Sequence, residues 1–186
     1  MSSVPAISLP VKPRIGIVMM SAVGDAVHVL PVLDALKRHS PDAHVVTVTL
    51  APDHLADYRR EASDDPMDVR FALRESSHTD FLYSGSDAAG KVEQLFADSK
   101  QLDVSPWAGR CDLVFVDGSH AYSYVVSDSE LALRLVAPGG LVLWHDYAGP
   151  RHAAGVYRAL NELSTRLPLV RLEGTTLVAH RRPVES

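Results

Sequence analysis

The chain has 186 residues, of which 46% are hydrophobic, and it carries a formal net charge of −5 at pH 7. This length favours one domain with a sizeable core and is too short for two full nucleotide-binding halves. The basic residues are scattered, apart from Arg181 and Arg182 near the end of the chain. Nucleic acid is therefore not an expected partner, because affinity for phosphate backbones depends on clustered Lys and Arg.

Cysteine usage and hydropathy indicate the compartment. Cys111 is the single cysteine, so it cannot form an internal disulfide and is interpreted as a small core residue. Residues 1–13 lack the pattern of a signal peptide, and no later stretch approaches the roughly 18 apolar residues that a membrane span needs. We expect a soluble, cytoplasmic protein with a flexible leader over residues 1–13 and a single domain over residues 14–183.

Strand and helix patterns alternate in the first half of the chain. Residues 14–20 form an apolar run typical of a buried strand, and apolar positions then recur at helical spacing as far as His39. Residues 44–50 are β-branched and predict a second strand. Residues 51–90 show little periodicity, and we expect helix fragments and a mobile loop there, which could act as a lid.

The second half of the chain repeats this alternation and ends in a hairpin. Strands are predicted at 91–96, 113–116 and 141–144, helices at 122–136 and 153–166, a Pro-Gly-Gly turn at 138–140, and a hairpin formed by 169–172 and 176–180. Together the patterns predict an α/β fold, a single Rossmann-like, doubly wound, mostly parallel sheet of about seven strands with a C-terminal antiparallel hairpin.

Ionisable side chains follow two neighbouring strands of this predicted sheet. Asp117 and His120 come after the fourth strand, and His145 and Asp146 come after the fifth. Because the carboxyl ends of adjacent parallel strands form the ligand crevice of an open sheet, these four side chains should converge. The functional site is therefore expected at this edge of the sheet.

A set of motifs in fixed order covers more than half of the chain. They are Ala97-Asp98-Ser99, Ser105-Pro106-Trp107-Ala108-Gly109, Asp117-Gly118-Ser119-His120, Ala137-Pro138-Gly139-Gly140, Trp144-His145-Asp146-Tyr147 and Gly174-Thr175-Thr176-Leu177. From about residue 43 onward the chain resembles the class I S-adenosylmethionine-dependent methyltransferases, specifically the family that includes sugar O-methyltransferases of macrolide tailoring. This resemblance implies a seven-stranded sheet with a reversed last strand and S-adenosylmethionine as cofactor.

The resemblance places the cofactor along the ends of the first four strands. The cofactor-binding candidates are Gly24, Asp25, Thr49, Asp98, Ser99 and Asp117. The turn at Gly24 has one glycine where the family has a Gly-rich turn. Thr49 stands where the family places an acid that holds the ribose, and a threonine offers at most one acceptor contact. Asp98 and Ser99 could contact the adenine, and a plain turn aspartate is the alternative interpretation of Asp98.

The same resemblance implies a metal site and a base. Asp117, His145 and Asp146 are the candidate ligands of Mg or Mn, although an imidazole suits zinc, manganese or iron better than magnesium. His120 and Asp117 are the candidate catalytic residues, with His120 as the base. Each residue also has a structural alternative. Asp117 could cap the helix that begins near residue 121, His145 could be hydrogen-bonded without metal, and His120 could be a surface or capping histidine.

Residues 15–43 follow a different pattern. Gly24-Asp25-Ala26-Val27-His28-Val29-Leu30-Pro31 and Ser40-Pro41-Asp42-Ala43 resemble the opening of heptosyltransferase-type glycosyltransferases. In those enzymes the aspartate of this turn, here Asp25, is implicated as a base at the acceptor sugar. The alternative for Asp25 is an ordinary acidic residue at a helix N-terminus, favoured by the dipole. We do not expect a donor domain of the kind that such glycosyltransferases need, because only the start of one of their domains is recognisable.

These observations predict an S-adenosylmethionine-dependent O-methyltransferase that acts on a small hydroxylated, sugar-like acceptor, with or without a divalent metal. The single-glycine turn and Thr49 leave a second hypothesis open, namely a degenerate, non-catalytic methyltransferase-like domain. A glycosyltransferase-related acceptor domain centred on Asp25 is the third. The expected partner is a small molecule, with no nucleic acid and no membrane, and the sequence leaves a homo-oligomer open.

Overall fold

The computed structural model describes residues 14–19, 42–50, 52–75 and 89–184, together with the single residues 38, 40, 83 and 85. The predicted leader, the helical pattern after the first strand, and the candidates Gly24 and Asp25 lie outside these residues. None of the described helices combines the length and apolarity that crossing a membrane requires.

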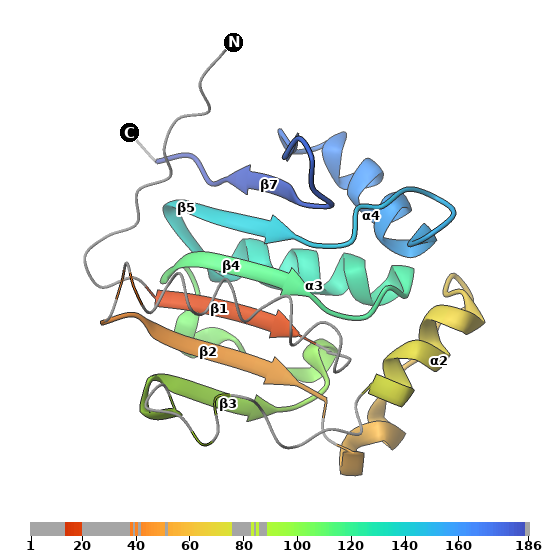
Figure 1. Ribbon diagram of the computed structural model, residues 1–186, viewed down its shortest axis with the longest axis horizontal. Coiled ribbons are helices and arrows are strands. Elements are labelled where there is room, and N and C mark those ends of the chain that lie inside the picture. Colours follow the sequence, from red (N-terminus) through yellow and green to blue (C-terminus); the bar gives the residue numbers. More distant parts are fainter. Residues whose placement is uncertain are drawn as a thin grey trace.

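Seven strands form one sheet in the order β3-β2-β1-β4-β5-β7-β6 (Figure 1). Their bounds are β1 (Arg14–Met19), β2 (His44–Thr49), β3 (Val92–Phe96), β4 (Cys111–Asp117), β5 (Val136–Trp144), β6 (Val170–Arg171) and β7 (Val178–Arg181). Strands β1 to β5 pair in parallel, whereas β7 is antiparallel to both β5 and β6. The predicted mostly parallel sheet with a terminal antiparallel hairpin is confirmed.

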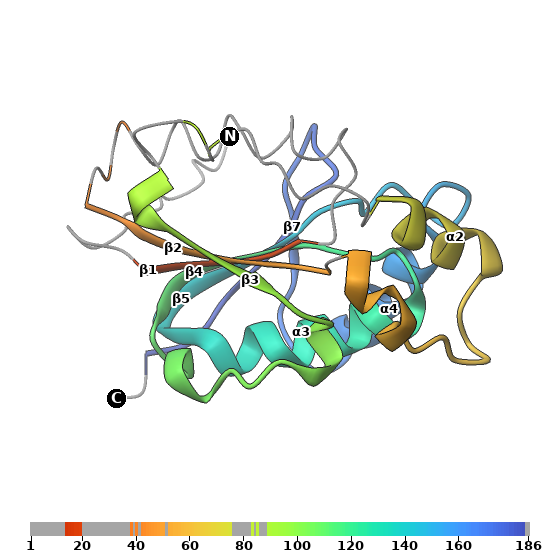
Figure 2. The same cartoon turned by 90° about the horizontal axis from the view of Figure 1, so that it is seen from below.

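Two helices, α3 (Tyr122–Leu135) and α4 (Ala154–Ser164), cover one face of the sheet (Figure 2). Their apolar sides pack on alternate residues of β4 and β5 and form the main core around Val114, Trp144 and Leu160. Helix α2 (Pro66–Glu75) and the 3₁₀ segment η1 (Pro52–Asp57) lie beyond the carboxyl ends of the strands (Figure 1). Three more 3₁₀ segments are η2 (Ala89–Lys91), η3 (Ser99–Gln101) and η4 (Ser105–Trp107).

The predicted Pro-Gly-Gly turn lies inside strand β5 rather than before it. Helix α3 ends at Leu135 and β5 begins at the next residue, with an irregularity in its pairing to β4. Gly139 adopts a φ of 78°, and a Cβ on Gly140 would lie 2.8 Å from the Val136 side chain. The arginines of the tail hold this bulged start, since Arg182 donates to the Val136 carbonyl at 2.8 Å. The glycines therefore permit a bulge, not a reversal of the chain.

Helix α3 begins on a cap supplied from far along the chain. The Ser123 backbone N–H donates to Asp64 Oδ1 at 2.7 Å, and the Ser123 hydroxyl donates to Asp64 Oδ2 at 2.8 Å. Asp64 is thus the acid that satisfies the first turn of α3. The alternative role of Asp117 as cap of this helix is not observed, because the Asp117 carboxylate contacts His145 instead.

The turn after β3 is fixed to the same helix by polar contacts. The Tyr124 hydroxyl donates to Asp98 Oδ2 at 3.1 Å, and Lys100 Nζ donates to the Ser123 hydroxyl at 2.8 Å. Asp98 Oδ1 accepts the Lys100 backbone N–H at 3.0 Å, which caps η3. Helix α3 therefore sets the position of the β3 turn relative to the end of β4.

One acidic residue of α3 is fully buried. Asp128 is 1% exposed, and the Ser99 hydroxyl lies close to its carboxyl group. Burial raises the pKa of Asp128 from 3.8 to about 7, and the nearby Ser99 hydroxyl opposes the rise. The Asp128 carboxyl therefore titrates near neutral pH.

Helix α4 approaches the loop after β4 at a glycine. A Cβ on Gly155 would lie 2.0 Å from the His120 carbonyl oxygen and 2.7 Å from the Tyr122 backbone nitrogen. Both obstacles are backbone atoms, so they cannot move aside as a flexible side chain could. The absence of a side chain at Gly155 therefore allows α4 to pack closely against the loop that carries His120.

Asp128→Asn should change how stability depends on pH. Between about pH 4 and pH 7, Asp128 keeps its proton in the folded state but has lost it in the unfolded chain. The free energy of unfolding of the wild type therefore falls as the pH rises through this range. Since one pKa unit is roughly 1.4 kcal/mol, Asp128→Asn should gain up to about 4 kcal/mol relative to wild type by pH 7. Urea unfolding at several pH values measures this. The exposed variant Asp53→Asn is the control, and parallel profiles for wild type and Asp128→Asn would contradict the prediction.

Gly155→Ala should destabilise the protein and displace the His120 loop. The added methyl group meets backbone atoms, and overpacking of this kind costs about 1–3 kcal/mol or more. Thermal unfolding gives the stability, and a crystal structure of the variant gives the loop position. Gly90→Ala is the matched control, because a Cβ at Gly90 would meet no atom within 4 Å. Equal effects of the two variants would refute the close approach.

Candidate functional site

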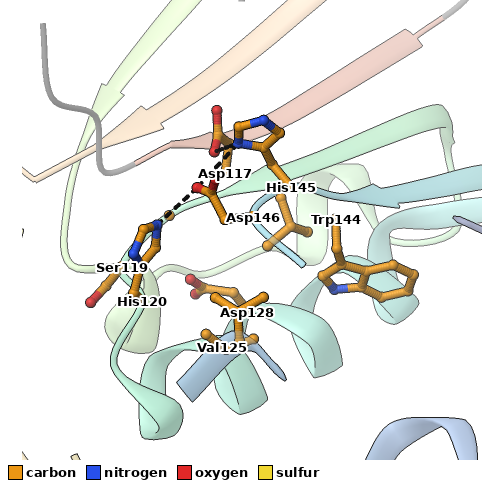
Figure 3. A pocket seen from close by; sticks show the side chains of 11 residues that line it. Asp117, Ser119, His120, Val125, Asp128, Trp144, His145 and Asp146 are labelled. Carbon is orange, nitrogen blue, oxygen red and sulfur yellow. Dashed lines mark hydrogen bonds and ion pairs between the residues drawn. The ribbon is translucent and has the colours of Figure 1, made fainter. Parts of the chain in front are cut away.

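The carboxyl ends of β4 and β5 bring together the four ionisable side chains singled out in the sequence (Figure 3). Asp117 is the last residue of β4, and His145 and Asp146 directly follow the end of β5 at Trp144. Parallel pairing in the register Val116 to Trp144 aligns the two strand ends. His120 reaches the same place from the loop between β4 and α3. The convergence expected from the strand-end rule is therefore present in the fold.

An unusual backbone conformation lets two consecutive residues serve one site. Successive side chains of a strand point to opposite faces, so His145 and Asp146 would diverge if β5 simply continued. Asp146 has a φ of 58°, in the left-handed region that few residues other than glycine adopt. The chain turns there, and both side chains then face Asp117 and His120 (Figure 3). Backbone strain of this kind is typical of functional positions.

Short polar contacts join the four residues into one chain. His145 Nδ1 lies 3.0 Å from Asp117 Oδ1 and 3.1 Å from Asp146 Oδ2. His120 Nε2 lies 2.8 Å from the same Asp146 oxygen. Asp146 therefore links the Asp117–His145 pair to His120.

The protonation states follow from these contacts. Hydrogen bonds to Asp117 and then to Asp146 raise the pKa of His145 from 6.5 to about 10, although burial opposes the rise. Burial raises the pKa of Asp146, but hydrogen bonds from His120 and His145 outweigh it and hold that pKa well below its usual range. At neutral pH an imidazolium thus lies between two carboxylates and occupies the position of a cation.

The residues present fit a divalent metal ion. One ligand atom from each of Asp117, His145 and Asp146 lies within 4.8 Å of the others. Asp117 Oδ2 is buried and has no hydrogen-bond partner in the described part of the chain, so one ligand oxygen is available. One imidazole and two carboxylates suit manganese, zinc or iron better than magnesium. Coordination through Nδ1 requires His145 to lose its proton.

The cofactor candidates that the structure describes lie at the same edge of the sheet, but their side chains are not equally available. Thr49 ends β2, and Asp98 and Ser99 follow β3, and all three are buried. The two Asp98 oxygens are taken by the Lys100 N–H and the Tyr124 hydroxyl, so its carboxylate fixes the turn in this structure. The Ser99 hydroxyl is buried close to the Asp128 carboxyl group. The candidates Gly24 and Asp25 lie outside the described residues.

Part of the predicted lid region is docked against this edge. Tyr58 stacks on Tyr124 with ring centroids 4.4 Å apart, and its hydroxyl lies 3.0 Å from the Ser119 hydroxyl. Lys100 Nζ pairs with Glu61 at 2.8 Å, close to the Asp64 cap. The segment from Tyr58 to Asp64 therefore contacts the loops that follow both β3 and β4.

Sequence reasoning missed three residues that shape the site, namely Asp64, Asp128 and Gly155. A signal for Asp128 was available, because it lies four residues after Tyr124 and so falls on the apolar side of the predicted helix. Asp64 and Gly155 act through contacts with distant backbone, which no local pattern encodes. Asp64 belongs to an Asp-Asp-Pro run that looks like an ordinary helix breaker.

Several solved structures share this fold. The O-methyltransferase TomG from Streptomyces achromogenes, solved with SAM, is 20% identical with a TM-score of 0.50, covering 91% of this chain and 73% of TomG. CalS11, a TDP-rhamnose 3'-O-methyltransferase, is 16% identical with a TM-score of 0.53, covering 91% of this chain and 71% of CalS11. MycE, solved with Mg, SAH and mycinamycin VI, is 15% identical with a TM-score of 0.51, covering 92% of this chain and 45% of MycE. Identities this low show the fold alone.

A search of curated proteins returned no match. The family described as "Methyltransferase domain" matches residues 27–147, about two-thirds of the chain. The matched range starts at residue 27, so it includes part of the segment for which a glycosyltransferase-like opening was predicted, and the family match does not support that prediction. It also contains β2 to β5 and all four residues of the crevice, from Asp117 to Asp146. The chain therefore belongs to the methyltransferase-domain family and has the class I methyltransferase fold.

Proposed function

We propose that this protein is an S-adenosylmethionine-dependent O-methyltransferase that acts on a small hydroxylated, sugar-like acceptor and uses a divalent metal. The convergence of Asp117, His145, Asp146 and His120 at one strand edge is the observation that carries the proposal. The family match supports methyl transfer. The SAM bound to TomG supports the cofactor, and the Mg bound to MycE supports the metal. The TDP-rhamnose activity of CalS11 supports a sugar-like acceptor.

Methyl transfer from a sulfonium to a hydroxyl is an in-line displacement. It needs alignment of the reactants, an acceptor for the hydroxyl proton, and exclusion of water. When bound, S-adenosylmethionine supplies the methyl group, whose carbon bonds to the acceptor oxygen while the carbon–sulfur bond breaks and sulfur keeps the electron pair. A bound metal lowers the pKa of a hydroxyl that it contacts. The remaining task of the protein is to position groups and move one proton.

His120 is the proposed base. Its side chain is 32% exposed, so an acceptor at the rim of the crevice can approach it. With Nε2–H donating to Asp146 Oδ2, the imidazole has its lone pair on Nδ1, which can accept the hydroxyl proton. The negative charge of Asp146 stabilises the imidazolium that results, as in other His–Asp pairs. The proton then leaves to solvent.

Asp117, His145 and Asp146 are the proposed metal ligands. The unpartnered Asp117 oxygen and the two groups that already surround the His145 imidazolium support this assignment. On metal binding His145 would lose its proton, so the metal ion would replace the imidazolium charge between the carboxylates of Asp117 and Asp146. Asp146 would then serve both the metal and His120, which couples the ligand cluster to the base.

The cofactor side is proposed to comprise Gly24, Asp25, Thr49, Ser99 and the turn that Asp98 fixes. Asp98 would act through the backbone of its turn, because its carboxylate is held by Tyr124 and by the Lys100 N–H. A degenerate domain that binds no cofactor is the second candidate. Two features favour it: the Asp98 carboxylate is already hydrogen-bonded within the protein, and Thr49 replaces the acid that holds the ribose. Cofactor binding separates the two.

Calorimetry should show that S-adenosylhomocysteine binds the purified protein. At ligand concentrations about 100 times the dissociation constant, binding should stabilise the fold by roughly 2.7 kcal/mol, which thermal unfolding detects. GTP is the control ligand and should give no shift, whereas a nucleoside diphosphate sugar is a candidate acceptor and is tested separately. Absence of heat and of thermal shift at millimolar S-adenosylhomocysteine would leave the degenerate domain as the better account, and stabilisation by the sugar nucleotide alone would favour the glycosyltransferase-related hypothesis.

Manganese should bind the wild type and should bind Asp117→Asn at least about tenfold more weakly. Because the pKa of His145 is about 10, coordination through its Nδ1 at pH 7 must expel about one proton, so affinity should rise with pH. Titration calorimetry in buffers of different ionisation enthalpy counts that proton. Glu130→Gln, an exposed acid paired with Arg166 away from the crevice, is the matched control. Unchanged affinity in Asp117→Asn would exclude this site.

A further inference from the structure

Two buried side chains of helix α3 contact the turn that follows β3. The Tyr124 hydroxyl donates to Asp98 Oδ2 at 3.1 Å, and the Asp128 carboxyl group lies close to the Ser99 hydroxyl. Asp98 and Ser99 are both 4% exposed, so these contacts are made inside the protein. The position of the turn therefore depends on side chains of α3 and not on contacts at the surface.

The Tyr124 hydroxyl acts as a donor and as an acceptor. It donates to Asp98, and it accepts the Arg59 backbone N–H at 2.9 Å. Burial raises the pKa of Tyr124, so the hydroxyl keeps its proton and remains a donor. One oxygen atom therefore joins the turn after β3 to the segment that runs from Tyr58 to Asp64.

The ring of Tyr124 is held by contacts that do not involve its hydroxyl. Tyr58 stacks on it with ring centroids 4.4 Å apart and an angle of 12° between the ring planes. Lys100 Nζ lies 4.2 Å from the centroid of the same ring. Leu50 and Val69 belong to the apolar cluster that contains Tyr124. Removing the hydroxyl alone should therefore leave the ring in place.

We propose that Tyr124 is a positioning residue for S-adenosylmethionine, which holds the Asp98 carboxylate inside the protein and so fixes the turn proposed to contact the nucleoside. Without the Tyr124 hydroxyl, a buried carboxylate oxygen loses its donor. Hydration of that oxygen would then draw the turn toward solvent. Cofactor binding must return the turn to its place, and this ordering lowers affinity.

This inference rests on the proposed function, because it assigns a role toward the same cofactor. The two can fail separately. If the wild type does not bind S-adenosylhomocysteine, the proposed function fails and this inference fails with it. If the wild type binds and loss of the Tyr124 hydroxyl changes nothing, the inference alone fails.

Titration calorimetry with S-adenosylhomocysteine compares wild type, Tyr124→Phe and Tyr122→Phe. Tyr124→Phe should bind roughly fivefold more weakly, the factor that one typical hydrogen bond represents. Its affinity for manganese should equal that of the wild type, because the ends of β4 and β5 are untouched. Tyr122→Phe is the matched control on the same helix, since its hydroxyl donates to Glu162 at the surface, and it should bind as the wild type does. Equal affinity of Tyr124→Phe and wild type for S-adenosylhomocysteine would overturn the proposal.

A double-mutant cycle separates positioning from general stability. Asp98→Ala removes the group through which Tyr124 is proposed to act. In that background Tyr124→Phe should weaken binding of S-adenosylhomocysteine by less than about twofold further, because the two residues share one interaction. The same loss in both backgrounds would show that Tyr124 does not act through Asp98, and the positioning role would be wrong.

A crystal structure of the wild type with S-adenosylhomocysteine decides the matter if a variant does not fold. We expect the nucleoside against residues 97–99, with Asp98 Oδ2 still accepting from the Tyr124 hydroxyl. An Asp98 carboxylate that has left Tyr124 to bind the nucleoside would overturn the proposal.

Discussion

Parallel pairing between β4 and β5 is the constraint on which the site depends. The register that sets Val116 beside Trp144 also sets Asp117 beside His145, so the two strand ends deliver their ionisable groups to one place. A slip of one residue would turn every side chain of β5 to the other face and separate these groups. The apolar side chains of α3 and α4, packed on Val114, Val142 and Trp144, fix that register.

Asp146 is the residue that contacts both histidines of the crevice. Its left-handed backbone lets its side chain join that of His145, and its Oδ2 accepts from both histidines. One strained residue therefore connects the candidate ligand cluster to the candidate base. Below this layer the buried Asp128 of α3 lines the same crevice, and Gly155 lets α4 approach the loop that carries His120. The site is thus positioned by contacts from three elements, β5, α3 and α4.

The sequence was sufficient for those features that depend on short-range pattern. Apolar runs predicted the strands, and the strand-end rule alone was enough to place Asp117, His120, His145 and Asp146 together. Features that depend on distant contacts were not predictable in this way: the Asp64 cap of α3 comes from 59 residues earlier, and the fit of Gly155 depends on a carbonyl of another loop. The glycines at 139 and 140 were misread as a turn, because a bulge and a reversal need the same residue type.

A crystal structure soaked with manganese and S-adenosylhomocysteine is the sharpest test, because it shows both halves of the crevice at once. We expect manganese bound by Asp117, His145 and Asp146, with His120 beside it and the nucleoside along the ends of β2 and β3. Manganese bound elsewhere, or a His145 imidazolium still held between the two carboxylates at saturating manganese, would contradict it.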